Sequence, residues 1–258
     1  MAKTSFRSAL VTGASSGIGE QIARTLAARG CALTLVARRT ERLAALAQEL
    51  GAAVAVDWLA ADLSSDDGIG IVERRLGEHP VELLVNNAGV GSGGRFHELP
   101  AEGEAAQVML NVLAVVRLTR AAAPAMVAAG RGGILNVSSI AGNQPLYGYA
   151  TYGATKAFVT SFTESIAFEL RGTGVHVSVL KPGYTDTEMN AGTVPDRSSV
   201  QGRLLWLGAE QVAVAAVDAV ERGRVHCVPG MTWKLADAVT QSLPRAAVRV
   251  LSSRVRAS

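Results

Sequence analysis

A tyrosine and a lysine stand four residues apart in a segment of helical periodicity, at Tyr152 and Lys156. Residues at this spacing lie on one face of a helix, so the ammonium group can stabilise a phenolate beside it. The pKa of an unperturbed tyrosine is about 10, and a neighbouring cation lowers it. Tyr152 is therefore a candidate general acid or base. The alternative is an ordinary surface pair, because this spacing occurs by chance in many helices.

Two other polar residues are candidates for the same chemistry. Ser139 ends a strand-like segment thirteen residues before Tyr152, and a hydroxyl at the carboxyl end of a strand could hold a substrate oxygen. Asn111 interrupts an apolar helical segment, where a buried amide needs hydrogen-bond partners. Asn111 could belong to the site or simply tie two backbone groups together.

A glycine-rich turn, Thr-Gly-Ala-Ser-Ser-Gly-Ile-Gly at 12–19, follows the first predicted strand. Such a turn presents backbone amides and a helix N-terminus to a pyrophosphate, and glycine permits close approach of the ligand. The glycine spacing differs from the commoner G-x-G-x-x-G, and a purely structural turn is the alternative. The candidate cofactor-binding residues here are Gly13, Ser15, Ser16, Gly17, Ile18 and Gly19.

The second predicted strand ends at Arg38 and Arg39, about 20 residues after the glycines. An acid at this place binds the ribose 2′-hydroxyl of NAD, whereas arginine suits the 2′-phosphate of NADP(H). A charge-assisted hydrogen bond to phosphate contributes about 1.5–3 kcal/mol, enough to favour NADP(H) about tenfold or more. The alternative is that both arginines cap an exposed strand end and pair with Glu41.

Polar residues also follow the third and fourth predicted strands. Asp62, with Leu63 next to it, could accept a hydrogen bond from an adenine amino group or cap the following helix. The fourth strand ends in Asn-Asn-Ala-Gly at 86–89, and these asparagines could be turn residues only.

Short apolar runs alternate with segments of helical period along the chain. This pattern predicts a doubly wound parallel sheet of the Rossmann type, with about seven strands and helices on both faces. We expect one domain over 1–258, a substrate lid near 185–207 and a basic C-terminal extension near 231–258. The predicted strands lie at 8–11, 32–37, 54–59, 83–86, 133–137, 176–180 and 225–228.

The composition excludes several classes of protein. With 258 residues, 48% hydrophobic and 18% charged, the chain is too apolar for a disordered or fibrous protein. Residues 234–258 carry five basic side chains against one acidic, so the rest has a net charge of −1 and offers no nucleic-acid footprint. No apolar run approaches the roughly 20 residues of a membrane span. Cys31 and Cys227 are expected as buried thiols, and the four scattered histidines predict no metal site.

Together these residues resemble the short-chain dehydrogenases/reductases, in the compact form with the T-G-x-x-x-G-x-G turn. The resemblance covers residues 7–230 and includes the glycine turn, Asp62, the Asn-Asn-Ala-Gly segment, the Tyr-x-x-x-Lys pair, and Pro182-Gly183 with Thr187. It implies catalytic roles for Asn111, Ser139, Tyr152 and Lys156. Tyr152 would pass a proton, Ser139 would orient the substrate oxygen, and Lys156 would bind the nicotinamide ribose and lower the pKa of the tyrosine. Asn111 would hold a water that links Lys156 to solvent.

The same resemblance implies further cofactor contacts and an NADP(H)-preferring member. The cofactor contacts expected outside the glycine turn are Arg38, Arg39, Asp62, Leu63, Asn87, Ala88, Gly89, Tyr152, Lys156, Pro182, Gly183, Thr185 and Thr187. The activity expected is reversible reduction of a ketone, aldehyde or ketoacyl group to an alcohol. A catalytically silent NADP(H)-binding sensor or scaffold is the alternative.

Apolar and aromatic candidates for the pocket lining favour an uncharged, apolar carbonyl or alcohol substrate. They are residues 91–96, Gln144, Leu146, Tyr147, Tyr149, Tyr184, Met189, Leu204 and Trp206. The extension carries Val248, Leu251 and Val255 on one helical face and Arg245, Arg249 and Arg256 on another. Packing of this face against its own domain or a second subunit is favoured over contact with a membrane surface. We expect a cytoplasmic homodimer or homotetramer.

Overall fold

Seven parallel strands form the central sheet of the computed structural model, which describes residues 5–191 and 200–242. The strand order is β3-β2-β1-β4-β5-β6-β9, which confirms the predicted doubly wound fold. Each of the seven predicted strands is present within two or three residues of its expected ends. Their bounds are β1 Ser8–Thr12, β2 Ala32–Ala37, β3 Val56–Ala60, β4 Leu83–Asn86, β5 Gly132–Val137, β6 Val175–Leu180 and β9 His226–Cys227.

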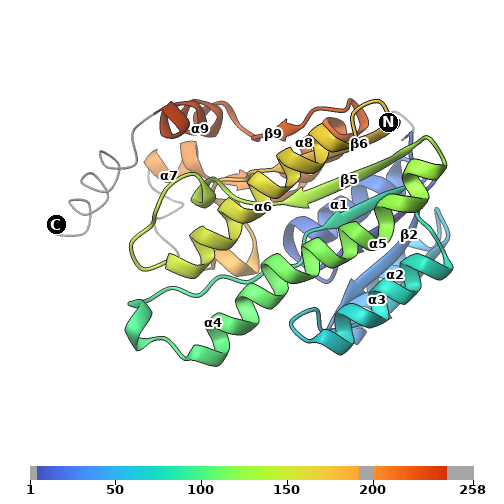
Figure 1. Ribbon diagram of the computed structural model, residues 1–258, viewed down its shortest axis with the longest axis horizontal. Helices are drawn as coiled ribbons and strands as arrows, with labels where there is room; N and C mark the ends of the chain where they lie inside the picture. The colour runs from blue at the N-terminus through green and yellow to red at the C-terminus, as the bar shows by residue number, and fades with distance from the viewer. Residues whose placement is uncertain (1–4, 192–199, 243–258) are drawn as a thin grey trace.

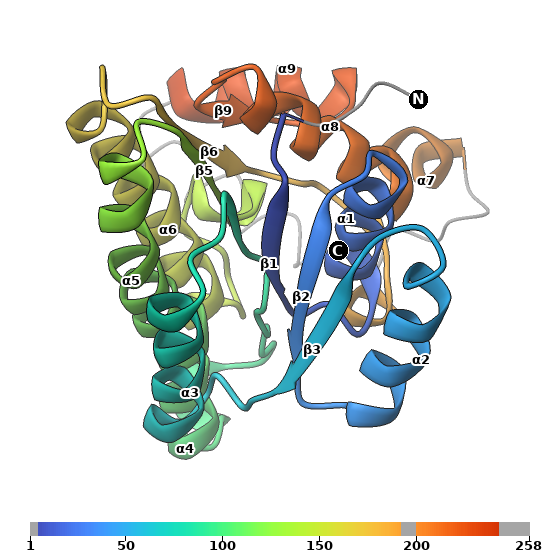
Figure 2. The same cartoon turned by 90° about the vertical axis from the view of Figure 1, so that its right-hand side faces the viewer.

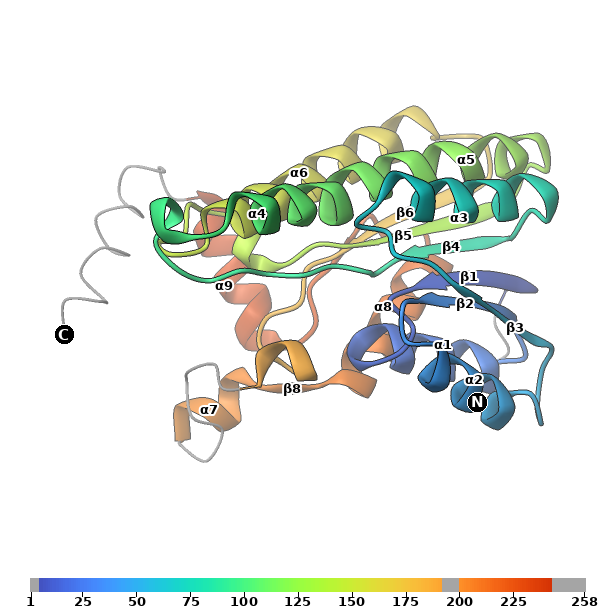
Figure 3. The same cartoon turned by 90° about the horizontal axis from the view of Figure 1, so that it is seen from below.

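Helices cover both faces of this sheet (Figures 1 and 2). One face carries α3 (Asp66–Glu78), α4 (Ala101–Val108), α5 (Ala114–Ala128) and α6 (Ala150–Glu169). The other carries α1 (Gly17–Ala28), α2 (Thr40–Leu50) and α8 (Ala209–Glu221), so the molecule has three layers (Figure 3). This arrangement follows from right-handed crossovers between parallel strands, which place each connecting helix on a face of the sheet.

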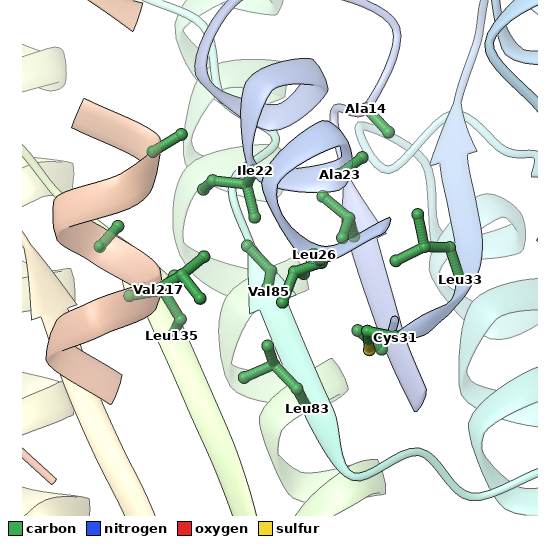
Figure 4. Close-up of a cluster of buried hydrophobic side chains, with 14 of the residues drawn as sticks. Ala14, Ile22, Ala23, Leu26, Cys31, Leu33, Leu83, Val85, Leu135 and Val217 are labelled. Atoms are coloured by element: carbon green, nitrogen blue, oxygen red, sulfur yellow. The ribbon is translucent and has the colours of Figure 1, made fainter. Parts of the chain in front are cut away.

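Each face of the sheet has its own hydrophobic cluster. On the α1/α8 face, Ile22, Leu26 and Val217 are fully buried against Leu83 and Val85 of β4 (Figure 4). Full burial of a leucine or isoleucine stabilises the fold by about 1.5–3 kcal/mol. The spacing of Ile22 and Leu26, one helical turn apart, directs both side chains to the sheet.

Both cysteines are buried and free. Burial raises the pKa of Cys31 to about 12 and that of Cys227 to about 11. The prediction of buried thiols is therefore confirmed, and neither sulfur is an available nucleophile at neutral pH.

The helix from Ala101 to Ala128 runs without a break through α4, the π-helical turn η2 (Met109–Leu113) and α5. By length and composition alone it could cross a membrane, in contrast to the expectation from apolar runs. It packs along α3, β4 and β5, however, and its inner face buries Leu118 and the polar Gln107 and Asn111. We therefore describe it as a core helix of a globular fold.

The chain after β6 differs from the regular alternation. The predicted lid contains β7 (Thr185–Asp186), the 3-10 turn η4 (Glu188–Asn190), α7 (Val200–Leu205) and β8 (Leu207–Gly208), and β7 pairs with β8 in a second, two-stranded sheet. Residues 192–199 lie outside the described part. The extension begins with α9 (Met231–Ser242), and the amphipathic helix predicted near 245–256 lies outside the described residues.

The order of the strands reverses between β1 and β4, where connections leave in opposite directions. Open α/β sheets bind ligands in the crevice at the carboxyl ends of the strands beside such a switch point. The glycine turn follows β1 and the Asn-Asn-Ala-Gly segment follows β4, so both lie at this crevice.

Candidate active site

The glycine turn packs so closely on the segment after β4 that side chains are excluded. A Cβ at Gly13, where φ is +66°, would lie 2.7 Å from Asn87 Nδ2, and one at Gly19 would lie 2.3 Å from the same atom. Gly17 has φ +59° and begins α1, whose N-terminus therefore opens onto the crevice. Backbone amides at a helix N-terminus favour an anion, so this turn fits the pyrophosphate of a dinucleotide.

Hydrogen bonds from Thr12 and Asn87 hold the turn and the β4 segment together. Thr12 Oγ1 donates to Val85 O at 3.2 Å and accepts from the amides of Asn87 and Ala88 at 2.9 and 3.0 Å. Asn87 Nδ2 donates to Thr12 O at 2.9 Å. Asn86 is a buried residue of β4 and donates to Asn136 Oδ1 of β5 at 2.9 Å. Neither asparagine is a turn residue only, because each joins two strands.

Arg39 lies against the serines of the glycine turn. Its guanidinium donates to Ser15 Oγ at 3.1 Å and Ser16 Oγ at 2.6 Å, and pairs with Glu188 at 2.8 Å. The acid that Arg39 reaches is thus Glu188 in the predicted lid, and not Glu41, which the alternative interpretation named as its partner. Hydrogen bonds from Arg39 and Arg42 lower the pKa of Glu188. A cation beside the turn and after β2 fits a 2′-phosphate.

Asp62 lies near Arg38, and its surroundings contradict one of its two predicted roles, that of helix N-cap. Burial opposes ionisation of Asp62, but hydrogen bonds from Ser64 and the charge of Arg38 outweigh it and lower the pKa. Ser65, rather than Asp62, caps α3, because its side chain accepts from Gly68 N at 3.1 Å. The N-cap interpretation of Asp62 was therefore wrong. The next residue, Leu63, is buried in the core.

Thr187 brings the segment after β6 to the glycine turn. A Cβ at Gly17 would lie 3.1 Å from its Cγ2. Before it in the chain, Thr185 is buried and donates to Gly183 O at 3.1 Å, while Pro182 O accepts from Ile140 N at 3.2 Å. The two predicted groups of cofactor residues, from the beginning and the end of the sheet, therefore line one crevice.

The Ser139 side chain lies beside the phenol of Tyr152, close enough to lower its pKa. Ser139 follows β5 and caps the 3-10 turn η3 (Ile140–Gly142), because its Oγ accepts from Ala141 N at 3.1 Å. Burial raises the pKa of Tyr152, and the Ser139 side chain offsets part of this rise. In the protein without cofactor, the pKa of Tyr152 is therefore raised, in contrast to the lowering expected from Lys156. The cause is that desolvation of the phenolate outweighs the other influences.

Lys156 is buried one turn after the tyrosine, with 5% of its surface exposed, so the pair is not an ordinary surface pair. Its Nζ lies 5.7 Å from the centroid of the Tyr152 ring and donates to Val137 O at 2.9 Å. Burial lowers the pKa of this ammonium to about 8. A Cβ at Gly89 would lie 3.3 Å from Nζ, which explains why a glycine ends the β4 segment.

Asn111 ties backbone groups together, as one of its two interpretations predicted. Its Oδ1 accepts from Val90 N at 3.0 Å, and its Nδ2 donates to Val90 O at 2.9 Å and Thr155 Oγ1 at 3.1 Å. The same Oδ1 would lie 3.2 Å from a Cβ at Gly89, which also adjoins Lys156. Asn111 is therefore both a clamp on the β4 segment and a neighbour of the ammonium group.

Two residues that sequence reasoning missed extend this clamp along α4. Gln107 Oε1 accepts from Ser92 N at 2.8 Å, and Glu104 Oε1 accepts from Ser92 Oγ at 2.5 Å. Both side chains are buried. Their spacing to Asn111 places all three on one helical face, and this polar stripe is the sequence signal that could have revealed them. The stripe holds Gly91, where a Cβ would lie 3.1 Å from the Tyr152 ring.

Aromatic side chains gather around the segments that follow β6 and β4. Tyr184 packs on Trp206 and Trp233 with ring centroids 5.5 and 5.6 Å apart. A Cβ at Gly93 would lie 2.9 Å from the ring of Tyr149. Trp233 was not among the predicted lining residues, because nothing in its local sequence shows that α9 returns to the crevice. Other predicted members, namely Tyr147, Met189, Leu204 and Phe96, are more than half exposed.

The family model described as short chain dehydrogenase matches residues 7–198, which contain the glycine turn, Ser139, Tyr152 and Lys156. The chain belongs to the short-chain dehydrogenase family. Members of this family are oxidoreductases that bind a nicotinamide dinucleotide. The tight glycine cradle, the helix N-terminus and the arginines of this short-chain dehydrogenase fit such a cofactor.

Solved and curated relatives agree with this assignment. A short-chain dehydrogenase from Sphingobium yanoikuyae, solved in complex with NADPH, superposes with a TM-score of 0.81 at 36% identity, over 91% of this chain and 93% of that one. A bulky-bulky ketone specific alcohol dehydrogenase from Comamonas testosteroni has a TM-score of 0.79 at 33% identity, over 93% and 96%. A sulfoacetaldehyde reductase from Chromohalobacter salexigens is 36% identical over 83% of this chain and 79% of its own length.

Proposed function

We propose that the protein is an NADPH-dependent carbonyl reductase, which reduces an uncharged, apolar ketone or aldehyde to an alcohol and also catalyses the reverse reaction. The observation that carries the proposal is the position of Ser139 and Tyr152 beside each other and beside the buried ammonium of Lys156, with Ser139 at the carboxyl end of β5. A protein that only bound the nucleotide would have no need of a partly buried phenol beside a buried ammonium.

The bound nicotinamide supplies the hydride for the carbonyl carbon. Ser139 donates a hydrogen bond to the carbonyl oxygen and orients it toward Tyr152. Tyr152 gives its phenolic proton to that oxygen as the negative charge develops, so the alcohol leaves neutral. The adjacent ammonium of Lys156 stabilises the phenolate, whose formation burial otherwise opposes. Solvent then returns a proton to the phenolate, and in alcohol oxidation each transfer runs in reverse.

The preference for NADPH is supported by the end of β2, which carries two arginines and no acidic residue. Arg39 already binds the serines of the glycine turn, and Arg38 lies near Asp62 at the neighbouring strand end. The solved relative that holds NADPH is consistent with this assignment. Two well-placed guanidinium groups give a 2′-phosphate charge-assisted hydrogen bonds that a 2′-hydroxyl cannot match.

The substrate class is supported by the aromatic residues at the segments that follow β4 and β6. Tyr149, Tyr184, Trp206 and Trp233 offer flat apolar surface, and apolar rings favour neutral substrates of some size. The Comamonas relative acts on bulky ketones, whereas the Chromohalobacter relative is named for a small anionic aldehyde. An experiment must therefore distinguish a bulky neutral ketone from a small anionic aldehyde as the substrate of this protein.

The test is loss of NADPH absorbance with a panel of bulky aryl ketones, steroid ketones, ketoacyl thioesters and sulfoacetaldehyde. We expect turnover of at least one bulky neutral carbonyl, at a kcat/KM at least about tenfold above that for sulfoacetaldehyde. Turnover of anionic aldehydes alone would overturn the substrate class. NADPH binding with no turnover on any carbonyl or alcohol would favour the silent sensor or scaffold.

Two further predictions accompany this proposal. The first is a cytoplasmic location, which is supported by the buried free thiols because thiols stay reduced in that compartment. Cell fractionation tests this location. The homodimer or homotetramer expected for the chain is tested by sedimentation equilibrium, in which a monomer at all concentrations would contradict it.

A further inference from the structure

Helix α9 is held to the end of the sheet by a buried ion pair. Lys181 Nζ lies 2.6 Å from Asp237 Oδ1, and Lys181 has only 1% of its surface exposed. A buried ammonium is costly without a partner, so this pair fixes where α9 can sit. Lys181 follows β6 and directly precedes Pro182-Gly183, the segment expected to meet the nicotinamide.

The same carboxylate also binds the other active-site segment. Asp237 Oδ1 accepts from Asn143 Nδ2 at 2.9 Å, and Asn143 donates as well to Thr240 Oγ1 at 3.0 Å. Asn143 directly follows the turn η3, which Ser139 begins and caps. Asp237 Oδ2 accepts from Gln241 Nε2 at 2.7 Å, so the charge is satisfied on both oxygens.

The two segments meet each other at the hydroxyl of Ser139. Ile140 N donates to Pro182 O at 3.2 Å, and Ser139 Oγ lies 3.5 Å from the same oxygen. A shift of either segment would therefore change where Ser139 Oγ points. One turn earlier on α9, Trp233 leaves no room at Gly183, since a Cβ there would lie 2.1 Å from its ring. Trp233 Nε1 also donates to Leu205 O at 2.8 Å.

We propose that Asp237 is a positioning residue of the active site, which acts through Asn143 and Lys181 to hold the Ser139 turn and the Pro182-Gly183 segment in one fixed relation. Helix α9 is on this view part of the catalytic apparatus, although none of the polar groups in this network is a candidate for proton transfer. The inference rests on the proposed reductase function, and it also makes a prediction for the cofactor-free protein.

The catalytic test is a mutant cycle between Asn143 and Ser139. Asn143→Ala is expected to lower kcat about tenfold, with the NADPH Kd from fluorescence titration within twofold of the parent. In a Ser139→Ala background the same substitution is expected to cost less than twofold, because the hydroxyl it positions is gone. Equal losses in both backgrounds would show a merely structural role and overturn the proposal.

A matched control removes a different hydrogen bond from the same carboxylate. Gln241→Ala leaves Asp237 bound to Lys181 and Asn143, so kcat is expected to stay within twofold of the parent. A tenfold loss in this variant would show that any disturbance of α9 lowers the rate, and would contradict positioning through Asn143.

The ion pair is tested by replacing both partners. Asp237→Asn alone is expected to lower Tm and kcat, since it leaves Lys181 buried without a counter-charge. The double variant Lys181→Met with Asp237→Leu is expected to regain Tm, whereas kcat stays reduced because Asn143 has lost its hydrogen bond to Asp237 and keeps only that to Thr240. Recovery of kcat to the parent value in the double variant would overturn the proposal.

Hydrogen exchange in the cofactor-free protein gives a readout that needs no activity. The amides of Gly142 and Asn143 donate within η3 at 3.1 and 3.0 Å. Asn143→Ala is expected to speed their exchange at least about fivefold, and Gln241→Ala to leave it unchanged. If the parent protein turns over no carbonyl but the two variants show this exchange pattern, the proposed function fails. The positioning of the Ser139 turn by Asp237 through Asn143 then still stands. Unchanged exchange in Asn143→Ala overturns the link itself.

Discussion

The two halves of the crevice are built in different ways. On the dinucleotide side, Gly13 and Gly19 pack directly on Asn87, and hydrogen bonds between residues of the two adjacent strand ends, such as Asn87 Nδ2 to Thr12 O, join the turn to the β4 segment. On the substrate side, side chains from distant parts of the sequence hold the geometry, such as Lys181 and Asp237. The first half depends on close packing at glycines, where a side chain would clash, and the second on hydrogen-bonded and ion-paired side chains from distant parts of the sequence.

This difference predicts how each half responds to substitution. A methyl group added at Gly13 or Gly19 would clash with the β4 segment. We therefore expect cofactor binding to be lost while the rest of the fold persists. Loss of one partner in a hydrogen-bonded pair moves a segment by a smaller amount. We therefore expect large losses of affinity from the first half and moderate losses of rate from the second.

Gly19→Ala tests the cradle most severely. Its Cβ would lie 2.3 Å from Asn87 Nδ2 and 2.4 Å from Gly13 O, distances that real Cβ atoms do not adopt. NADPH affinity by fluorescence titration is expected to fall at least about 100-fold. Gly77→Ala in α3 is the control, because a Cβ there meets nothing within 4 Å. Gly19→Ala binding NADPH within threefold of the parent would contradict a backbone-built site.

Arg38→Ala and Arg39→Ala separate the two forms of the cofactor. Loss of one or two charge-assisted hydrogen bonds is expected to weaken NADPH binding about 10–100-fold, and NADH binding less than about threefold. Arg74→Ala, an exposed arginine of α3, controls for net charge. Equal losses for both cofactors would place the 2′-phosphate elsewhere.

Gln107→Leu tests the polar stripe of α4, which belongs to the second kind of construction. Without its oxygen, Ser92 N loses an acceptor and the loop at Gly91 can move from the Tyr152 ring. We expect kcat to fall about tenfold while the NADPH Kd stays within twofold. Gln48→Leu on the exposed side of α2 is the matched control. A change in NADPH affinity with unchanged kcat would contradict this prediction, because it would place the polar stripe in the dinucleotide half.

Lys156→Met is expected to have the smallest effect, which is a change in how the free energy of unfolding of the cofactor-free protein depends on pH. Its folded-state pKa of about 8 lies below the ordinary value of 10.5, so the unfolded chain binds more protons between these two pH values. Relative to Lys156→Met, the parent's free energy of unfolding should therefore rise as pH increases from 8 toward 10.5, by at most about 1.4 kcal/mol per pH unit. Urea denaturation at several pH values measures this difference. A constant or falling difference would show that Lys156 is not a buried cation.

The arrangement of the glycine turn and the arginines could be predicted from the sequence because its signals are local. The glycine turn, Arg38 and Arg39 lie within two strands and one helix, and the alternation of apolar runs predicts how those elements stack. The seven strands followed from the same alternation.

The second half could not be predicted in the same way. Lys181 and Asp237 are 56 residues apart, and neither stands in a recognisable motif. Trp233 meets Gly183 only because α9 returns to the crevice, which no local period encodes. The raised pKa of Tyr152 also depends on burial, and a Tyr-x-x-x-Lys spacing carries no information on desolvation.

The most direct measurement is single-turnover reduction by Tyr152→Phe, with a carbonyl substrate from the panel and saturating NADPH. Phenylalanine keeps the aromatic ring but has no proton to give, so the hydride-transfer rate is expected to fall about 10²–10⁴-fold with NADPH affinity unchanged. A rate within threefold of the parent would contradict the assignment of Tyr152 as the acid.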